Sequence, residues 1–223
     1  MIKQIGSWYL PDDENTSQVT NIVEQGQFSC YKPIVSSLAY LGKFDRAIDV
    51  GTWIGDSTDI MSRIFSTVYG FEANPEVFEC ATKNLKNRNN AILKNVALSN
   101  TEGVKELFNG PSSFSGWINT LEPEDINEEK FSKKMSVGCK TLDSYNFLNI
   151  DFIKIDIDSH EGYFLEGATN FFQENNPVIL IEYKPTVMQR QHVTMKNPLE
   201  ILQMIGYKIE MQPTEIDFIL KRK

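Results

Sequence analysis

The stretch AIDVGTWIGDS, residues 47–57, decides the fold of this chain. Its first four residues form a short apolar run interrupted by one aspartate, which predicts a buried strand. Gly51 and Gly55 follow in a turn, where glycine lets the backbone approach a ligand closely. Asp56 or Ser57 can then cap a helix. Apolar residues at three-and-four spacing give that helix one buried face: Ile60, Met61, Ile64 and Phe65.

A second strand, residues 67–71, ends at Glu72, twenty-one residues beyond Gly51. This spacing is typical of the carboxylate that holds ribose hydroxyls in nucleotide-binding βαβ units. Asp49 narrows the choice of ligand, because a carboxylate beside a dinucleotide pyrophosphate would bring two like charges together. S-adenosylmethionine carries an ammonium, a sulfonium and a ribose diol, so it fits Asp49, Glu72 and the open turn better than NAD does. The plainer alternative is a capping aspartate and a surface glutamate.

Composition limits the other classes of protein. A chain of 223 residues with 41% hydrophobic content is enough for one packed α/β domain, which we place over residues 1–223. The net charge of −8 and pI near 4.9 argue against nucleic-acid binding, which needs clustered basic residues. Three cysteines without metal or disulfide spacing, and no apolar run near the ~20 residues of a membrane span, predict a cytoplasmic protein without a membrane partner.

Two segments flank the predicted core. Residues 1–32 are expected to form an N-terminal arm laid over the domain, and Pro33 opens a helix that ends at Gly42. Residues 109–134 combine Gly, Ser and Pro with an aromatic island and an acidic run. We predict a loop or lid there, with a solvated insertion as the alternative.

The segment after Glu72 continues the alternation of strands and helices. Asn74 and Pro75 are typical of an N-cap and a first helical residue. A strand is predicted over residues 91–99, and an added strand over residues 104–108.

A second informative stretch is FIKIDIDSHE, residues 152–161. It begins as a buried strand and ends with three carboxylates and a histidine: Asp156, Asp158, His160 and Glu161. A helix and a further strand follow, and that strand ends at Glu182. Because parallel strands end at one edge of a sheet, these groups should face the crevice where α/β sheets bind ligands. The last helix starts at Asn197, and two closing strands predict an antiparallel hairpin.

At this point the chain resembles the FkbM-like S-adenosylmethionine-dependent methyltransferases over residues of about 46 to 210. The matching segments are Ile48-Asp49-Val50-Gly51, Ile54-Gly55-Asp56, Phe71-Glu72-Ala73-Asn74-Pro75, Asn84-Leu85, Ala97-Leu98-Ser99, Thr141-Leu142-Asp143, Ile153-Lys154-Ile155-Asp156, His160-Glu161, Gly167-Ala168, Pro177, Glu182 and Gly206-Tyr207. Two positions depart from the family pattern. Trp53 stands where the family often has a small or polar residue, and Asp158-Ser159 where it usually has Glu-Gly.

The resemblance implies an α/β, three-layer Rossmann-like methyltransferase fold, with a mostly parallel sheet and a terminal antiparallel hairpin. It implies methylation of a hydroxyl on a sugar or another small metabolite, with S-adenosyl-L-methionine as cofactor. The implied cofactor-binding residues are Asp49, Gly51, Thr52, Trp53, Gly55, Asp56 and Ser57 at the turn, Glu72, Ala73 and Asn74 at the ribose, Val96 and Ala97 at the adenine, and Asp156 at the methionine end.

Methyl transfer from a sulfonium mainly requires the acceptor hydroxyl to be held close and in line, with a base for its proton. The candidates for that base are His160, Asp156, Glu182, Asp158 and Glu161. His160 ranks first because its unperturbed pKa lies near neutrality. A structural hydrogen-bonding role for this histidine is the alternative.

Other functions stay open at this stage. Asp156-x-Asp158 resembles the metal-binding pair of nucleotide-sugar glycosyltransferases, and with His160 and Glu182 it offers ligands for Mg or Mn. A cofactor-binding protein without catalysis, acting through a partner, is a third reading. The sequence leaves assembly into a homo-oligomer undecided, and residues 184–196 give no recognisable acceptor chemistry.

Overall fold

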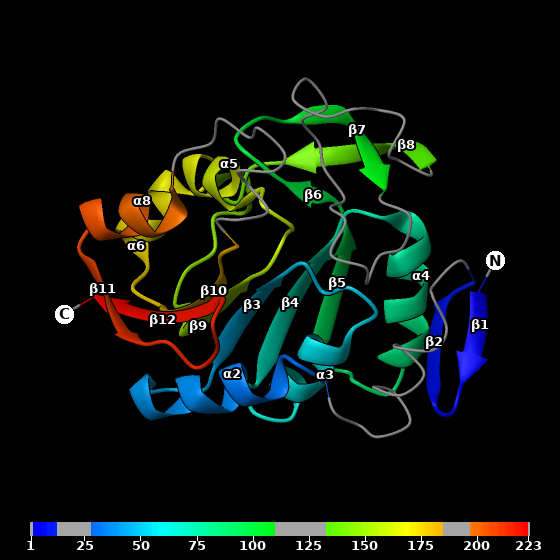
Figure 1. The fold of residues 1–223 in the computed structure, drawn as a ribbon, viewed down its shortest axis with the longest axis horizontal. Coiled ribbons are helices and arrows are strands. Elements are labelled where there is room, and N and C mark those ends of the chain that lie inside the picture. The colour runs from blue at the N-terminus through cyan, green and yellow to red at the C-terminus, as the bar shows by residue number, and fades with distance from the viewer. Residues whose placement is uncertain (1, 13–27, 110–132, 185–196, 223) are drawn as a thin grey trace.

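The computed structural model describes residues 2–12, 28–109, 133–184 and 197–222. These residues form a central seven-stranded sheet in the order β11-β12-β10-β9-β3-β4-β5 (Figure 1). Its strands are β3 Arg46–Val50, β4 Thr67–Glu72, β5 Ala91–Asn95, β9 Phe152–Ile155, β10 Val178–Glu182, β11 Tyr207–Met211 and β12 Asp217–Arg222. Strands β10, β9, β3, β4 and β5 run parallel, and β12 is antiparallel to its neighbours β10 and β11. The predicted α/β fold, with its terminal antiparallel hairpin, is confirmed.

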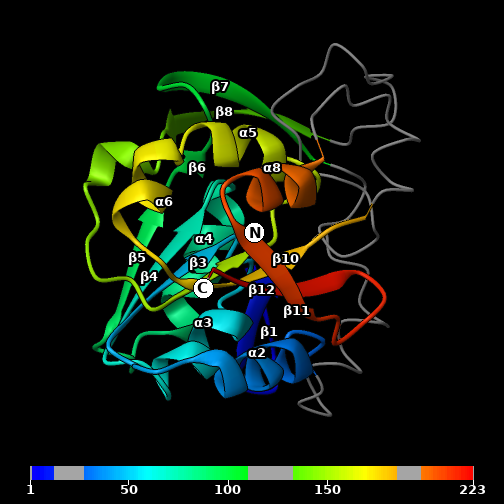
Figure 2. The same cartoon turned by 90° about the vertical axis from the view of Figure 1, so that its left-hand side faces the viewer.

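Helices cover both faces of this sheet (Figures 1 and 2). One face carries α2 and α3, and the other carries α5, α6 and α8. The helices are α2 Tyr31–Ser37, α3 Asp56–Ser62, α4 Pro75–Asn84, α5 Glu161–Glu166, α6 Thr169–Glu174 and α8 Pro198–Met204, with short 3-10 helices η1 Leu38–Tyr40 and η4 Asp143–Tyr145. The three layers predicted from the sequence are therefore present.

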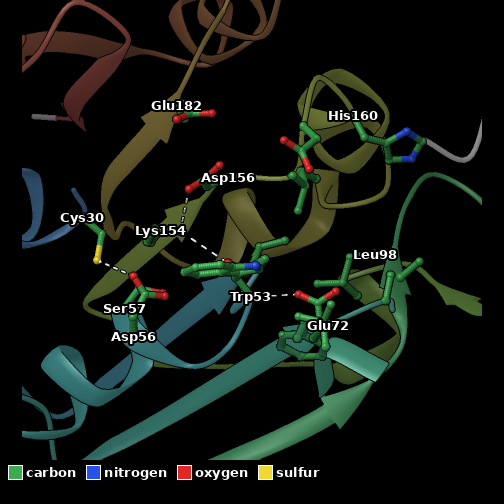
Figure 3. A pocket seen from close by; sticks show the side chains of 18 of the residues that line it. Cys30, Trp53, Asp56, Ser57, Glu72, Leu98, Lys154, Asp156, His160 and Glu182 are labelled. Atoms are coloured by element: carbon green, nitrogen blue, oxygen red, sulfur yellow. Dashed lines mark hydrogen bonds and ion pairs between the residues drawn. The ribbon is translucent and has the colours of Figure 1, made fainter. Parts of the chain in front are cut away.

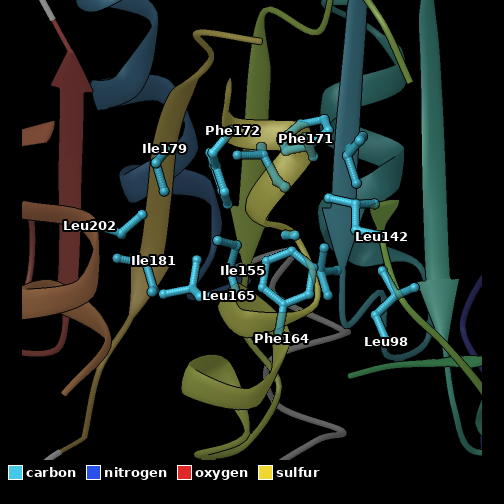
Figure 4. Packing of buried hydrophobic residues seen from close by; sticks show 14 of the residues in the cluster. Leu98, Leu142, Ile155, Phe164, Leu165, Phe171, Phe172, Ile179, Ile181 and Leu202 are labelled. Atoms are coloured by element: carbon cyan, nitrogen blue, oxygen red, sulfur yellow. The ribbon is translucent and has the colours of Figure 1, made fainter. Parts of the chain in front are cut away.

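Alternation along the strands produces two cores, because successive side chains point to opposite faces. On one face Ile155, Ile179 and Ile181 pack against α5, α6 and α8 through Phe164, Leu165, Phe171, Phe172 and Leu202 (Figure 4). On the other face Phe152, Val178 and Leu180 pack with Ile34 and Met61 from α2 and α3. Each of these buried side chains contributes about 1.5–3 kcal/mol relative to exposure. The two cores hold the carboxyl ends of β3, β4, β9 and β10 in fixed positions.

A smaller sheet stands apart from the main one, in the order β6-β8-β7 (Figure 1). Its strands are β6 Ala97–Leu98, β7 Gly103–Asn109 and β8 Lys133–Lys140. The added strand after residue 103 was predicted, but its partner β8 was not. The expected strand over residues 91–99 is divided between the two sheets. The predicted loop or lid falls mainly on residues 110–132, which lie outside the described residues.

The structure adds detail to one local expectation and corrects two. The N-terminal arm contains a hairpin, β1 Ile2–Ile5 with β2 Trp8–Pro11, whose Tyr9 N–H donates to the Asn84 side chain of α4 at 2.7 Å. The N-cap of α3 is Gly55, so Asp56 lies inside the first turn. The helix expected after residue 160 is two helices, broken at Gly167, where a Cβ would lie 2.0 Å from the Ser99 carbonyl oxygen. By contrast, Asn74 caps α4 as predicted.

In the part of the chain that the structure describes, none of the helices combines the length and the apolar character needed to cross a lipid bilayer.

Candidate active site

A cavity of about 380 Å³ opens at the carboxyl ends of β3, β4, β9 and β10 (Figure 3). This is where open parallel sheets bind ligands, and the volume is within the usual range for small-molecule sites. Glu72 and Leu98 line one part of the cavity, and Asp156 and Glu182 line another (Figure 3). Acidic side chains therefore line both parts of the cavity.

The turn after β3 is shaped by the close approach of two strand ends. Gly51 has a φ of +85°, and a Cβ on it would lie 1.9 Å from the backbone oxygen of Asp156. The N–H groups of Gly51 and Thr52 both donate to the Phe71 carbonyl, at 3.0 and 3.1 Å. Position 51 requires glycine, because its φ is positive and because a side chain there would collide with the Asp156 backbone. The turn thus lies directly against the acidic end of β9.

Glu72 is held in place by the backbone of two neighbouring segments. Its Oε2 accepts the Trp53 N–H at 3.0 Å, and its Oε1 accepts the Asn74 N–H at 2.9 Å. Burial raises the pKa of Glu72 to about 7, against the opposing effect of these two amides. Each carboxylate oxygen keeps a second acceptor position. The side chain is therefore a fixed acceptor for a pair of hydroxyl donors.

Asp49 does not line the cavity, contrary to the expectation that it binds a cationic cofactor group directly. It is fully buried, and its Oδ2 accepts hydrogen bonds from Ser57 and Thr58 at 2.6 Å each. Its Oδ1 lies 3.6 Å from the Nζ of Lys154. The cation nearest to Asp49 thus comes from the protein, although its Oδ1 accepts no hydrogen bond from the described residues, and its Oδ2 fixes the start of α3.

Lys154 connects the glycine turn after β3 with the end of β9. Its buried Nζ donates to Asp156 Oδ2 at 3.1 Å and to the Gly51 carbonyl at 3.4 Å, in addition to its contact with Asp49. Burial lowers the pKa of Lys154, but Asp156 and Asp49 outweigh this and raise it well above the ordinary value. The ammonium is therefore charged and ties the glycine turn to the acidic end of β9.

The carboxyl groups of Asp156 and Glu182 are neighbours, and each affects the pKa of the other. Burial raises the pKa of Asp156, but the ammonium groups of Lys154 and Lys184 outweigh this, and the net pKa lies below its usual value. Burial and the neighbouring Asp156 raise the pKa of Glu182 to about 9, although Lys184 lies 2.5 Å from Glu182 Oε2. Asp156 is therefore the stronger acid of the two and is ionised near neutral pH, while Glu182 is the weaker acid and keeps its contact with the Lys184 ammonium.

His160 lines the cavity, but its environment contradicts the reason for ranking it first. Its Nε2 lies 2.9 Å from Ser99 Oγ, and the ring points away from Asp156 and Glu182 (Figure 3). Burial lowers its pKa to about 3, with a smaller contribution from Lys105. The ring is therefore neutral and weakly basic. The structural hydrogen-bonding alternative describes the observed contact.

Glu161 also differs from expectation, because it does not line the cavity. Its Oε1 accepts the N–H groups of Ile157 and Ser159, at 3.2 and 3.3 Å. Burial raises its pKa to about 7. Glu161 therefore stabilises the loop between β9 and α5, and Asp158 is the residue of this loop that reaches the cavity as a carboxylate.

The predicted site residues divide into two groups. Those that line the cavity are Gly51, Trp53, Asp56, Ser57, Glu72, Ala73, Val96, Ala97, Asp156, Asp158, His160 and Glu182. Those outside its lining are Asp49, Thr52, Gly55, Asn74 and Glu161. Asp56 reaches the cavity beside Cys30, whose Sγ lies 3.1 Å from its Oδ2, and burial raises the pKa of Asp56 to about 6.

The sequence analysis did not assign Cys30, Lys154 or Lys184 to the site. The sequence signal for Lys154 is a lysine within the apolar run of residues 152–155, and in the structure it lies opposite Asp49 in the paired strands β3 and β9. A lysine within an otherwise apolar strand needs a buried partner. Lys184 follows Glu182 closely, and its role depends on the direction of the chain after β10.

The carboxylates do not assemble into a metal centre within the described residues, where no group of three or more potential ligands is arranged to hold an ion. The positive charge beside Asp156 and Glu182 comes instead from Lys154 and Lys184.

The fold and the cavity together define a class: proteins with the methyltransferase form of the α/β sheet. Among solved structures, a TehB-like SAM-dependent methyltransferase from Corynebacterium glutamicum has a TM-score of 0.50 at 12% identity, covering 95% of this chain and 97% of that one. The methyltransferase FkbM from Methylobacillus flagellatus has a TM-score of 0.51 at 17% identity, covering 79% of this chain and 42% of that one.

The family itself is shown by the sequence match. Residues 49–220 match the methyltransferase FkbM domain, so the chain belongs to the FkbM methyltransferase family. A curated relative, the hexuronic acid methyltransferase AglP of Haloferax volcanii, is 30% identical over 141 residues. That match covers 59% of this chain and 53% of the relative, so the chain spans about half the length of this relative.

Proposed function

We propose that this chain transfers the methyl group of S-adenosylmethionine to a hydroxyl of a sugar or a similar small metabolite. The observation that carries the proposal is the placement of Glu72, a fixed hydroxyl acceptor, in the same cavity as the ionised Asp156. The family supports methyl transfer, and the relative that acts on a hexuronic acid supports a sugar acceptor.

The residues present fit the cofactor. Glu72 would accept hydrogen bonds from the ribose hydroxyls, and the apolar Val96, Ala97 and Leu98 would contact the adenine. Gly51, Asp56 and Ser57, which line the cavity beside Asp156, would lie along the methionine part. When bound, S-adenosylmethionine supplies an electrophilic methyl group on a sulfonium.

Asp156 is the base in this proposal, in place of His160. The proton of an alcohol becomes strongly acidic as its oxygen bonds to a methyl carbon, so a carboxylate of low pKa suffices to accept it. The pKa of Asp156 is lowered and its side chain is 36% exposed, whereas the pKa of Glu182 is raised and its side chain, in contact with Lys184, is 15% exposed. Lys154 keeps Asp156 in its charged form and in position.

Cofactor binding tests the first half of the proposal. Glu72→Gln removes a charge-assisted acceptor worth about 1.5–3 kcal/mol, so calorimetry should show S-adenosylhomocysteine binding about ten-fold or more weakly. Because Glu72 also accepts two backbone amides, thermal melting of the variant must accompany the binding measurement. Glu79→Gln, which changes an exposed carboxylate on α4, is the matched control. Unchanged affinity in Glu72→Gln, or tighter binding of NADH, would contradict the proposal.

Turnover tests the second half, with labelled methyl transfer from S-adenosylmethionine to a panel of glycosides. Asp156→Asn should slow transfer by about 10²–10⁴-fold, the usual contribution of a general base. His160→Gln should slow it by less than about ten-fold, because the ring is neutral and directed to Ser99. A reversed order would return the base to His160. Transfer that vanishes in EDTA and returns with Mg or Mn would instead support the metal alternative.

A further inference from the structure

A second cavity, also of about 380 Å³, adjoins the first on the side of β12. We call it the acidic chamber. It lies between the start of α2, the end of β10 and the turn at residues 214–217 that joins β11 to β12. It shares Ser29, Cys30, Lys154, Asp156, Glu182 and Ile216 with the first cavity. The two cavities therefore meet at Asp156 and Glu182, whereas Glu72 lines only the first.

Four carboxyl groups of the described residues line the chamber, together with Ser29, Cys30, Thr214 and Lys154. Asp156 and Glu182 belong to its shared wall, and Glu215 and Asp217 come from the turn. Lys154 is the only basic residue among its described lining residues, and its ammonium already contacts Asp49 and Asp156. A ligand in the chamber consequently meets hydrogen-bond acceptors and negative charge.

The turn holds its two carboxyls in a defined arrangement. Thr214 Oγ1 donates to the Asp217 carboxylate and accepts the N–H groups of Ile216 and Asp217 at 3.3 and 3.0 Å. Burial raises the pKa of Asp217, while the Thr214 hydrogen bond opposes the rise. Glu215 is exposed at the end of the turn. The turn between β11 and β12 therefore forms one wall of the chamber. A substitution of Glu215 changes the charge of this wall and keeps the hydrogen bonds of Thr214.

We propose that the acidic chamber is the acceptor subsite, that it takes an uncharged polyhydroxyl compound, and that it rejects sugars bearing a carboxylate. This inference rests on the proposed function, because it assumes that the cofactor occupies the Glu72 end. Hydroxyl groups can donate to several fixed carboxyl oxygens at once. A carboxylate on the acceptor would instead bring like charges together and leave buried polar groups unpaired, which is how a site excludes the wrong ligand.

The test compares two glycosides that differ at one carbon. Methyl β-D-glucopyranoside and methyl β-D-glucuronide are titrated separately into protein saturated with S-adenosylhomocysteine, and binding is followed by ligand-observed NMR. The neutral glycoside should bind more tightly than the uronide by about five-fold or more. Glu215→Lys should strengthen uronide binding by about five-fold at low salt, and added salt should reduce the gain. Glu210→Gln changes an exposed carboxylate of the same hairpin outside the chamber and should alter neither affinity.

The outcomes separate this inference from the proposed function. If S-adenosylhomocysteine does not bind, the proposed function fails before any glycoside is added. If it binds, but the uronide binds as well as the neutral glycoside or neither of them binds, the chamber is not a subsite for neutral polyols. Preference for the neutral glycoside that Glu215→Lys leaves unchanged would also overturn the assignment to this chamber.

Discussion

Replacing Gly51 with alanine should destabilise the protein in two separable ways. Gly51 has a φ of +85°, and an L-residue in the left-handed region costs about 1–2 kcal/mol. The added Cβ would also stand 1.9 Å from the Asp156 carbonyl oxygen. Because backbone cannot rotate away as a side chain can, an overpacking cost of about 1–3 kcal/mol follows. The sum is about 2–5 kcal/mol, a large part of the ~5–15 kcal/mol that stabilises a domain.

Gly206 provides the matched control, because it has a φ of +95° but faces only the flexible side chain of Arg222, at 3.4 Å. Gly206→Ala should therefore cost only the conformational part. For a chain of this size each kcal/mol lowers Tm by about 2–4 °C, so Gly51→Ala should melt roughly 4–20 °C below the parent. Gly206→Ala should lose roughly 2–8 °C. Calorimetric melting of the three proteins measures both values.

The difference between the two variants isolates the contact between the glycine turn and β9. If Gly51→Ala melts no lower than Gly206→Ala, the two strand ends are not in the close contact described, and the argument for a backbone cradle at Gly51 fails.

Two further predictions concern buried charge. Lys154→Met should lower the free energy of unfolding measured in urea by about 3–5 kcal/mol, because it leaves the fully buried Asp49 without a cation. Lys83→Met, at an exposed ion pair, is the control and should cause a much smaller loss, and equal losses would show that the buried pair is not formed. His160 has a pKa of about 3 in the folded protein against about 6.5 when unfolded, so its contribution to stability is complete above pH 6.5 and is lost as the pH falls from about 6.5 to 3. The stability of the parent should therefore fall relative to His160→Gln across that window, by up to about 1.4 kcal/mol per pH unit, and two parallel pH profiles would rule out a buried neutral histidine.

The sequence predicted the parts of the site that depend on local order. Gly51, Glu72 and Asp156 all stand at or just after strand ends, and the parallel arrangement of the strands brings them to one cavity. Short apolar runs were sufficient to place β3 and β9, which are almost entirely buried, and β4 was placed by the apolar residues before Glu72. No knowledge of side-chain contacts was needed for this part of the prediction.

The roles of Asp49 and His160 could not be predicted in the same way. The partner of Asp49 is Lys154, which is distant in sequence and adjacent only after β3 and β9 pair. The pKa of His160 depends on its burial against Ser99, which sequence spacing does not report. Charge and burial at these two positions are properties of the assembled sheet.

The two departures from the family pattern coincide with unusual backbone. Trp53, Asp158 and Ser159 have φ values of 47°, 53° and 72°, a region that residues other than glycine seldom occupy. Trp53 and Asp158 line the first cavity. The chain therefore retains costly conformations where side chains meet the site, which is where such conformations tend to occur.

The pairing of β7 with β8 determines how well the chain tolerates changes in length between these two strands. The two strands remain paired up to Asn109 and Lys133, so the ends of the intervening segment are held side by side. Closing a loop between fixed ends costs only about 0.6 kcal/mol more for each doubling of its length. Changes in chain length between residues 110 and 132 should therefore cost little free energy, and they need not disturb the pairing of β7 with β8 or the seven-stranded sheet.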